Sequence, residues 1–321
     1  MFRPLRGMSV AAVLAGCFML QFPGLVAAQP GRPLLDAPPG DTGRRITENG
    51  IVANYFPAPR NAPAVLVLSG SVGGLTGNDI SIALQAEGFS VLLLSYFRGP
   101  GQNQNAELIP LEYFATALTW LQRQPEVDSA KVGVVGVSKG AEAALVVAVR
   151  HPELNAIVAA LPSSVVWPGI IWKPRTGPIS SSWSEQGKPL PHLPHVPYDA
   201  SKGGTMADNY AASLKALPLH SESVIPVERI AARMLLVCGE ADKIWPSCPM
   251  ARQIQDRLRA HGRPAAALLA YEDAGHLAFG SPLPADDPRI ATSGGTDRGN
   301  RTAQSDSWKK AVAFLKANLE N

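Results

Sequence analysis

The hydrophobic positions of this chain form short apolar runs that alternate with amphipathic stretches. Runs of strand length occur at 64–68, 91–94, 132–137, 156–161, 234–238 and 266–271. The spacing of apolar residues predicts helices at 80–87, 111–123, 141–149, 250–261 and 305–319. Because the strands are apolar on both faces, the pattern predicts a mostly parallel central sheet with helices on both faces. The C-terminal ends of such strands share one edge, where ligands bind.

Residues 162–226 break this alternation. The segment is rich in Pro, Ser and Gly and carries Trp167, Trp172 and Trp183. Connections of this length are uncommon in a compact domain and are often binding loops or lids. We therefore expect a long insertion before the late strands, in which at least one of these tryptophans lines the pocket for an acyl group or its entrance. The alternative interpretation is packing of the three rings at the surface.

The N-terminus has the features of a secretory signal. Arg3 and Arg6 precede an apolar run at 8–20, and small residues end at Ala28. This predicts a signal peptide over residues 1–28, cut before Gln29. A lead-in follows at 29–61, with one short strand near 51–55, and then a catalytic domain at 62–321.

Export to the periplasm or the medium follows from that reading. A lipobox-like sequence ending at Cys17 offers lipidation as a minority alternative. The apolar run is shorter than the ~20 residues of a spanning helix, so no stable membrane span is expected in the mature chain. Export also permits a bridge between Cys238 and Cys248, yet nothing in the sequence fixes the Cα separation that it needs, which favours two buried free thiols.

A nucleophile motif stands between a predicted strand and a predicted helix. Residues 136–140 read Gly-Val-Ser-Lys-Gly, which matches G-x-S-x-G. The turn from strand to helix exposes the serine hydroxyl at the edge of the sheet, and the glycines on both sides remove side chains that would clash there. Ser138 is therefore the predicted nucleophile, and a glycine-serine turn that only caps the helix is the structural alternative.

A serine nucleophile needs a base, and the base needs an acid that orients it. Of the six histidines, His276 alone follows a late predicted strand directly, where this fold places its base. The acid should lie between serine and histidine in chain order. Asp242, after the strand at 234–238, is the first candidate, and Glu240 is its competitor.

An oxyanion hole requires two backbone N–H groups. We expect one from Lys139, the residue after the nucleophile, and one from Ser71 or Val72 in the glycine-rich loop after 64–68. His192 and His195 are three residues apart in a proline-rich loop, too few ligands for a metal site. We expect no metal and no cofactor. A formal net charge of +3 in 321 residues does not indicate a nucleic-acid partner.

Together these motifs resemble the C-terminal catalytic domain of the acyl-CoA thioesterase and bile acid-CoA:amino acid N-acyltransferase family, which is itself similar to dienelactone hydrolases. The resemblance spans residues 62–319, and the stretches that carry it are 70–75, 111–114, 136–142, 225–229, 259–262, 274–276, 294–296 and 305–308. It implies an α/β-hydrolase fold and a catalytic triad of Ser138, Asp242 and His276.

The resemblance also bears on activity. Thioesterase members of the family use serine and amino-acid-conjugating members typically use cysteine, so serine favours hydrolysis. We therefore expect a serine hydrolase that cleaves an acyl ester or thioester through an acyl-Ser138 intermediate. Export would separate the chain from coenzyme A, which leaves a general carboxylesterase open. Acyl transfer to an amine is a further alternative. A non-catalytic binding protein is the alternative from a different functional class.

Overall fold

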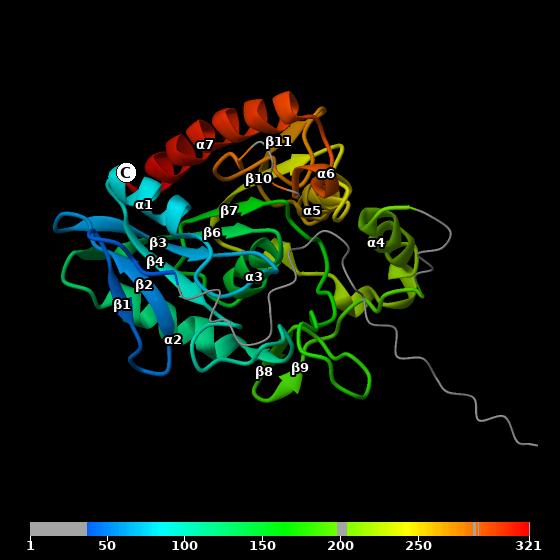
Figure 1. Cartoon of the computed structure of the whole chain (residues 1–321), viewed down its shortest axis with the longest axis horizontal. Coiled ribbons are helices and arrows are strands. Elements are labelled where there is room, and N and C mark those ends of the chain that lie inside the picture. Colours follow the sequence, from blue (N-terminus) through cyan, green and yellow to red (C-terminus); the bar gives the residue numbers. More distant parts are fainter. Residues whose placement is uncertain (1–36, 198–203, 285–286, 288, 321) are drawn as a thin grey trace, which may run out of the picture.

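A computed structural model of the chain describes residues 37–197, 204–284, 287 and 289–320 (Figure 1). The predicted signal peptide and Cys17 lie outside the described residues. The centre is an eight-stranded sheet in the order β1-β2-β4-β3-β6-β7-β10-β11. Its strands are β1 (Arg44–Ile46), β2 (Val52–Phe56), β3 (Ala62–Leu68), β4 (Ser90–Ser95), β6 (Val127–Val137), β7 (Ala156–Ala160), β10 (Arg233–Gly239) and β11 (Ala267–Tyr271).

The six strands from β4 to β11 in this order are parallel, whereas β1 and β2 add an antiparallel edge. β2 falls where the sequence predicts the one strand of the lead-in, and β1 was not predicted. β1 is only three residues long and buries only Ile46, which gives no periodic signal. The last part of the predicted lead-in therefore shares one sheet with the strands that follow residue 61.

Helices cover both faces of this sheet. The described helices are α1 (Asn78–Ala86), α2 (Leu111–Gln122), α3 (Lys139–Ala148), α4 (Met206–Leu214), α5 (Ser247–Ala260), α6 (Arg289–Ser293) and α7 (Asp297–Leu319). Of these, α1, α2, α3, α5 and α7 contribute side chains to the two cores beside the sheet. Alternate residues of β3 serve the two cores: Leu66 packs with α2, α3 and α5, and Val67 with α1 and α7. In Figure 1, α7 lies above the sheet and α2 below it. The predicted fold class is confirmed: this is an α/β-hydrolase fold.

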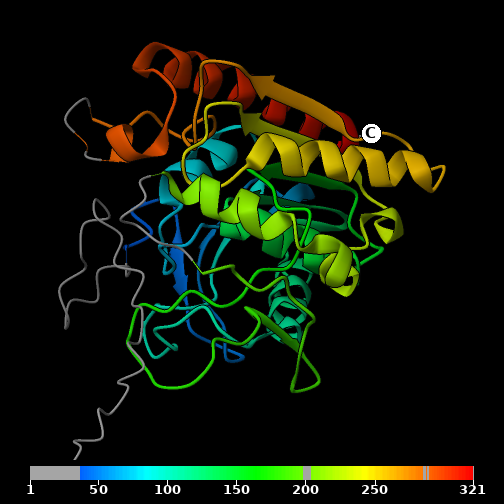
Figure 2. The same ribbon diagram turned by 90° about the vertical axis from the view of Figure 1, so that its right-hand side faces the viewer.

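The insertion at 162–226 has secondary structure of its own. It contains β8 (Trp183–Glu185), β9 (Lys188–Pro189), α4 and two short 3₁₀ helices at Leu217–Leu219 and Ser221–Ser223; a third, Val227–Arg229, follows it. β8 pairs with β5 (Ile109–Pro110), just before α2, and forms a small three-stranded sheet with β9. Figure 2 shows α4 in front of the central sheet. The insertion is therefore tied to the core by strand pairing.

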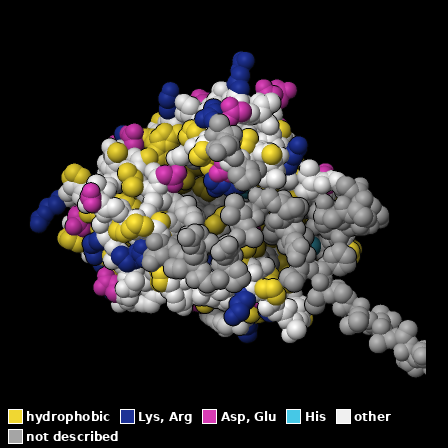
Figure 3. Space-filling model, in the orientation of Figure 1, with side chains coloured by type: hydrophobic (Ala, Val, Ile, Leu, Met, Phe, Trp, Pro, Cys, Tyr) yellow, Lys and Arg dark blue, Asp and Glu magenta, His cyan; other side chains and the backbone are white. Residues whose placement is uncertain are grey.

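The surface mixes charges of both signs. On the face drawn in Figure 3, lysine and arginine side chains are interspersed with acidic ones. Across the described ranges, no helix has both the length and the apolarity that crossing a membrane requires. Even α7, with 23 residues, is amphipathic: Ala311, Leu315 and Leu319 are buried, whereas Lys309 and Lys310 are exposed.

Candidate active site

Ser138 occupies a strained turn between β6 and α3. Its φ is 57°, a left-handed value that a residue with a side chain rarely adopts. The turn is held by a hydrogen bond from the Ser138 N–H to the Ala160 carbonyl (2.8 Å). A Cβ at Gly136 would stand 2.2 Å from the Gly140 carbonyl oxygen, and a Cβ at Gly140 would stand 2.1 Å from that of Leu68. Both glycines are required because backbone crosses backbone here.

His276 lies in the loop after β11 and faces Ser138. Its Nε2 is 2.9 Å from Ser138 Oγ. The loop is fixed by the backbone: the His276 N–H donates to the Ser293 carbonyl (2.8 Å), and the Gly275 N–H donates to Asn300 Oδ1 (2.8 Å). The predicted base and nucleophile are therefore within hydrogen-bond reach, although 138 residues separate them in the sequence.

Asp242 contacts the other nitrogen of the imidazole. Its Oδ2 is 2.9 Å from His276 Nδ1 and also accepts a hydrogen bond from Ser247 Oγ (2.7 Å). Its Oδ1 accepts from the N–H groups of Ile244 (2.8 Å) and Trp245 (3.2 Å). The side chain is only 2% exposed. Donors surround this carboxylate, and they fix its orientation toward the ring.

Glu240, the competing acid, points elsewhere. Both of its carboxylate oxygens accept hydrogen bonds from the Arg252 guanidinium on α5. Its side chain is 30% exposed, against 2% for Asp242. Of the two acids on this loop, Asp242 alone contacts His276.

The glycine-rich loop after β3 lies against the nucleophile. A Cβ at Gly70 would stand 3.3 Å from Ser138 Cβ. Side chains hold three carbonyls of the loop: Tyr96 donates to that of Ser69 (2.6 Å), Trp172 to that of Ser71 (2.9 Å), and Arg98 to that of Val72 (2.9 Å). No acceptor among the described residues engages the N–H groups of Ser71 and Val72. The N–H of Lys139, in the first turn of α3, likewise has no acceptor within its own helix.

The three tryptophans of the insertion lie in different surroundings. Trp172 is partly buried, with its indole on the Ser71 carbonyl and the Arg98 guanidinium 4.2 Å from its ring centroid. Trp167 and Trp183 are 1% and 0% exposed and pack inside the molecule. Of the three, Trp172 alone is bonded to the loop beside Ser138.

An aromatic chain that the sequence did not predict connects the insertion to His276. The Trp245 ring contacts His276 edge-on, with centroids 6.1 Å apart, and Tyr210 follows at 5.9 Å. Tyr210 in turn packs edge-on against Trp167 (4.7 Å) and His195 (4.9 Å). Trp245 stands three residues after Asp242, which is a signal that could have placed it near the site. Nothing local in the sequence marks Tyr210 or His195.

His195 belongs to this packing. It stacks on Trp167 with ring centroids 5.3 Å apart, and its Nδ1 is buried without a hydrogen-bond partner. Burial, followed by the charge of Lys139 and by His192, lowers the pKa of His195 to about 4, which leaves the ring neutral at pH 7. Within the part of the chain that the structure describes, no three potential metal ligands come together.

Cys238 and Cys248 form a disulfide, so the expectation of free thiols is wrong. Cys238 is in β10 and Cys248 in the first turn of α5, with Cα atoms 5.1 Å apart. The sequence could not reveal this because the return of α5 onto β10 sets the separation. The bridge encloses the segment that carries Asp242 and Ser247.

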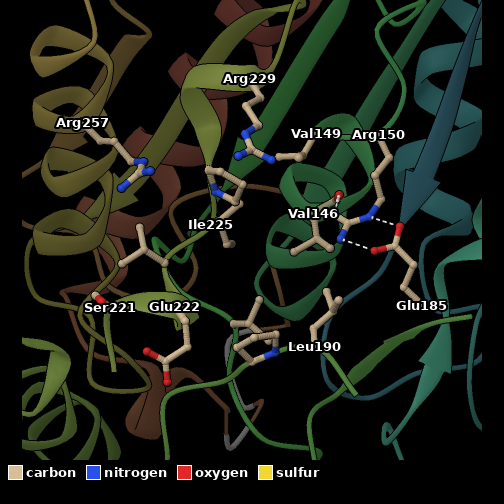
Figure 4. Close-up of a pocket in the computed structure, with 14 residues that line it drawn as sticks. Val146, Val149, Arg150, Glu185, Leu190, Ser221, Glu222, Ile225, Arg229 and Arg257 are labelled. Atoms are coloured by element: carbon tan, nitrogen blue, oxygen red, sulfur yellow. Dashed lines mark hydrogen bonds and ion pairs between the residues drawn. The ribbon is translucent and has the colours of Figure 1, made fainter. Parts of the chain in front are cut away.

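A cavity lined by residues of α3, β8 and α5 lies away from this hydroxyl–imidazole–carboxylate arrangement. It has a volume of about 530 Å³ and is seen in Figure 4. Its walls come from the C-terminal part of α3, from β8 and from residues 221–229, with Arg257 of α5. Ser138 precedes the other end of α3, so this cavity is not the space above the serine.

The sequence of this chain also matches known proteins. The model of the family described as "BAAT / Acyl-CoA thioester hydrolase C terminal" matches residues 109–321. The mouse protein "Acyl-coenzyme A thioesterase 2, mitochondrial" is 29% identical over 292 residues, which cover 88% of this chain and 61% of the relative. Mouse "Acyl-coenzyme A amino acid N-acyltransferase 2" is 28% identical over 299 residues, 88% of this chain and 66% of the relative.

A solved esterase structure from Pyrococcus furiosus has the same fold. It superposes with a TM-score of 0.53 and 16% identity, over 86% of this chain and 93% of the esterase. At that identity the likeness concerns the fold alone. The chain spans just under two thirds of the length of the two mouse relatives.

The prediction of export is corrected by these comparisons. The mouse thioesterase that this chain resembles is named as a mitochondrial enzyme, and not as a periplasmic or secreted one. The segment on which export was argued, residues 1–28, lies outside the described residues. An apolar run after two arginines is a compositional signal, and composition alone does not separate one targeting class from another.

The predicted family is confirmed. The family model matches about two thirds of the sequence, from the strand before α2 to the C-terminal end, and that stretch contains Ser138, Asp242 and His276. This match is to the model of the C-terminal region of the family. The chain belongs to the family of acyl-CoA thioester hydrolases and bile acid-CoA:amino acid N-acyltransferases.

Proposed function

We propose that this chain is a serine-dependent acyl hydrolase that cleaves an acyl thioester or a carboxylic ester through an acyl-Ser138 intermediate. The observation that carries the proposal is the chain of hydrogen-bond distances from Asp242 through His276 to Ser138, 2.9 Å at each step. Three loops far apart in the sequence meet at that point. A serine hydroxyl that contacts a histidine, which in turn contacts a buried carboxylate, is the arrangement that serine-dependent acyl transfer uses.

The acylation step uses the two imidazole nitrogens differently. Asp242 accepts a hydrogen bond from Nδ1–H and so holds the tautomer in which the lone pair of Nε2 faces the Ser138 hydroxyl. Nε2 takes the hydroxyl proton while Oγ forms a bond to the acyl carbon and the carbonyl electrons move onto oxygen. When the carbonyl re-forms, the bond to the thiolate or alkoxide breaks, and the leaving group takes the proton from Nε2.

The oxyanion of that step would accept hydrogen bonds from backbone N–H groups. Lys139 supplies one at the start of α3, where the helix dipole also favours negative charge. Ser71 or Val72 supplies the other, from the loop whose carbonyls Tyr96, Trp172 and Arg98 hold. Water then attacks the acyl carbon and gives a proton to Nε2 of His276. When the carbonyl re-forms, the bond to Ser138 Oγ breaks, Oγ takes that proton back from Nε2, and the acid is released.

Acyl-CoA thioesters are the proposed substrate class. The name of the mouse relative supports this, and the argument from export against coenzyme A falls with the prediction of export. The test compares purified protein on acyl-CoA thioesters, by release of free thiol, with p-nitrophenyl esters of matched chain length. We expect kcat/KM to be higher for the thioester at equal chain length. A higher value for every ester would make the chain a carboxylesterase.

Acyl transfer to an amine is the second candidate, because one relative is named an amino acid N-acyltransferase. Product analysis with an amino acid added in excess separates the two activities. Hydrolysis gives free acid at a rate that the amino acid does not change. If the N-acyl amino acid became the main product, the acceptor would be an amine and the proposal of hydrolysis would fail.

A further inference from the structure

A buried ion pair lies in the first turn of α3, directly after the nucleophile. Lys139 Nζ and Glu142 Oε2 are 2.7 Å apart, and the two side chains are 2% and 0% exposed. Removing two charges from water costs as much as their attraction returns, so such a pair is no stabilising device by itself. Because the pair does not stabilise the fold by itself, its other contacts indicate what it does.

Glu142 also binds the insertion, and does so twice. Its Oε1 accepts a hydrogen bond from the backbone N–H of Trp167 (3.1 Å) and another from the indole Nε1 of Trp183 (2.8 Å). Lys139 Nζ lies 5.3 Å from the Trp183 ring centroid. One carboxylate thus joins the residue after Ser138 to two points of the insertion that are sixteen residues apart.

The stretch between these two points reaches the reaction edge. It contains Trp172, whose indole holds the Ser71 carbonyl. From its first anchor, the Trp167 ring contacts Tyr210, which contacts Trp245, which contacts His276. A change at Glu142 would therefore shift the insertion where it borders the glycine-rich loop after β3 (the oxyanion loop) and the aromatic side of His276.

We propose that Lys139 and Glu142 are a positioning pair: they seat the insertion on the turn that carries Ser138, and thereby shape the surface that receives the acyl chain. Neither side chain touches the reacting atoms. Their effect is on which chain lengths reach Ser138 productively. This inference rests on the proposed function, in which Ser138 is the nucleophile, and it adds a determinant of specificity to it.

The test uses two neutral double variants. In Lys139→Met with Glu142→Gln, the amide oxygen still accepts from Trp167 and Trp183. In Lys139→Met with Glu142→Met, no acceptor remains, while both charges are absent from each protein. The comparison therefore isolates the two hydrogen bonds that anchor the insertion.

Phosphonylation of Ser138 by a methyl and a dodecyl fluorophosphonate gives the readout, with intact mass as the detector and Tm as the fold control. The Gln variant is the reference, because it shares Lys139→Met with the Met variant and any effect of that change is common to both. The ratio of dodecyl to methyl rates should be about tenfold lower in the Met variant than in the Gln variant, the size of one to two hydrogen bonds. An equal ratio in two folded variants would overturn the inference.

A milder variant decides the matter if the Met variant does not fold. Trp183→Phe keeps an aromatic ring on Lys139 and removes one of the two donors to Glu142. It should lower the dodecyl rate about threefold and leave the methyl rate unchanged; an unchanged ratio would overturn the inference. If wild-type Ser138 reacted with neither probe, the proposed function would fail first, and that failure is recognised before any variant is made.

Discussion

The loops at the ends of the strands and the insertion at 162–226 are fixed in different ways. Backbone contacts at the ends of the strands set the loops that carry Ser138, Asp242 and His276, and glycines allow the closest of these contacts. Side chains from distant segments set the insertion, as the contacts of Trp183 with Phe114 and Glu142 illustrate. Chemistry held by local geometry can be read from a sequence, whereas a surface held by distant contacts cannot.

The acid loop offers the strongest test of the first half of this comparison. Asp242→Asn should lower kcat by about 10⁴-fold, because His276 would then favour the wrong tautomer. Glu240→Gln is the matched control and should stay within about threefold, since it breaks only the partly exposed pair with Arg252. Steady-state kinetics of the two purified variants decides it. A deeper loss in Glu240→Gln would reassign the acid.

The disulfide sharpens the comparison because it encloses that same loop. Replacing Cys238 and Cys248 together by serine should lower the free energy of unfolding by about 3 kcal/mol, the loss for a closed loop of this size. Urea unfolding of the double variant and of the wild type, with and without reductant, gives the number. Reductant should lower wild-type stability and leave the variant unchanged. Identical curves for all four samples would mean that the bridge contributes nothing.

The pH dependence of the free energy of unfolding provides a test of the insertion, because His195 is buried in it. Its pKa is lowered from 6.5 to about 4 in the folded protein, so below pH 6.5 the unfolded chain binds a proton that the folded chain does not. The free energy of unfolding is therefore unaffected by this group above pH 6.5 and falls as the pH drops toward 4, by about 3 kcal/mol in all.

The variant His195→Phe keeps a ring on Trp167 and cannot titrate. Its unfolding free energy should fall less steeply than that of the wild type between pH 6.5 and 4, and the difference between the two curves isolates this histidine from the carboxylates. Parallel curves would show that His195 is not held neutral by its surroundings.

Trp172 gives the smallest expected effect and bears on where the two regions meet. Trp172→Phe keeps the stacking surface for Arg98 and removes the N–H that holds the Ser71 carbonyl. We expect kcat to fall about threefold to tenfold, equally for short and long acyl chains, because the oxyanion loop serves both. A loss confined to long chains would make Trp172 a pocket residue that acts apart from the loop.

The sequence allowed the fold to be predicted to within a few residues where elements are long. α2 and α3 differ from their predicted ranges by at most two residues, because an apolar stripe and the glycines at 136 and 140 mark them. α7 begins eight residues before its predicted start, at a Thr296 cap. The first turns of α7 are polar and present no apolar stripe, which explains the early part that was missed.

Inside the insertion the prediction stopped at a lid-like loop. β8 is three residues long and pairs with β5, which comes more than seventy residues earlier. No local period encodes such a pairing. The Lys139–Glu142 pair was missed for a related reason: in sequence it is an ordinary i, i+3 pair, and only the packing of Trp167 and Trp183 over it makes it buried.

The central claim is that Ser138 carries the acyl group, and trapping that group tests it most directly. Wild-type protein is mixed with an acyl-CoA thioester in excess, quenched in acid within the first turnover, digested and mapped by mass. The account predicts one added acyl mass on the peptide that contains Ser138, and none in Ser138→Ala, whose turnover falls to the residual level of a site without its nucleophile. An adduct on another residue, or wild-type turnover by Ser138→Ala, would contradict it.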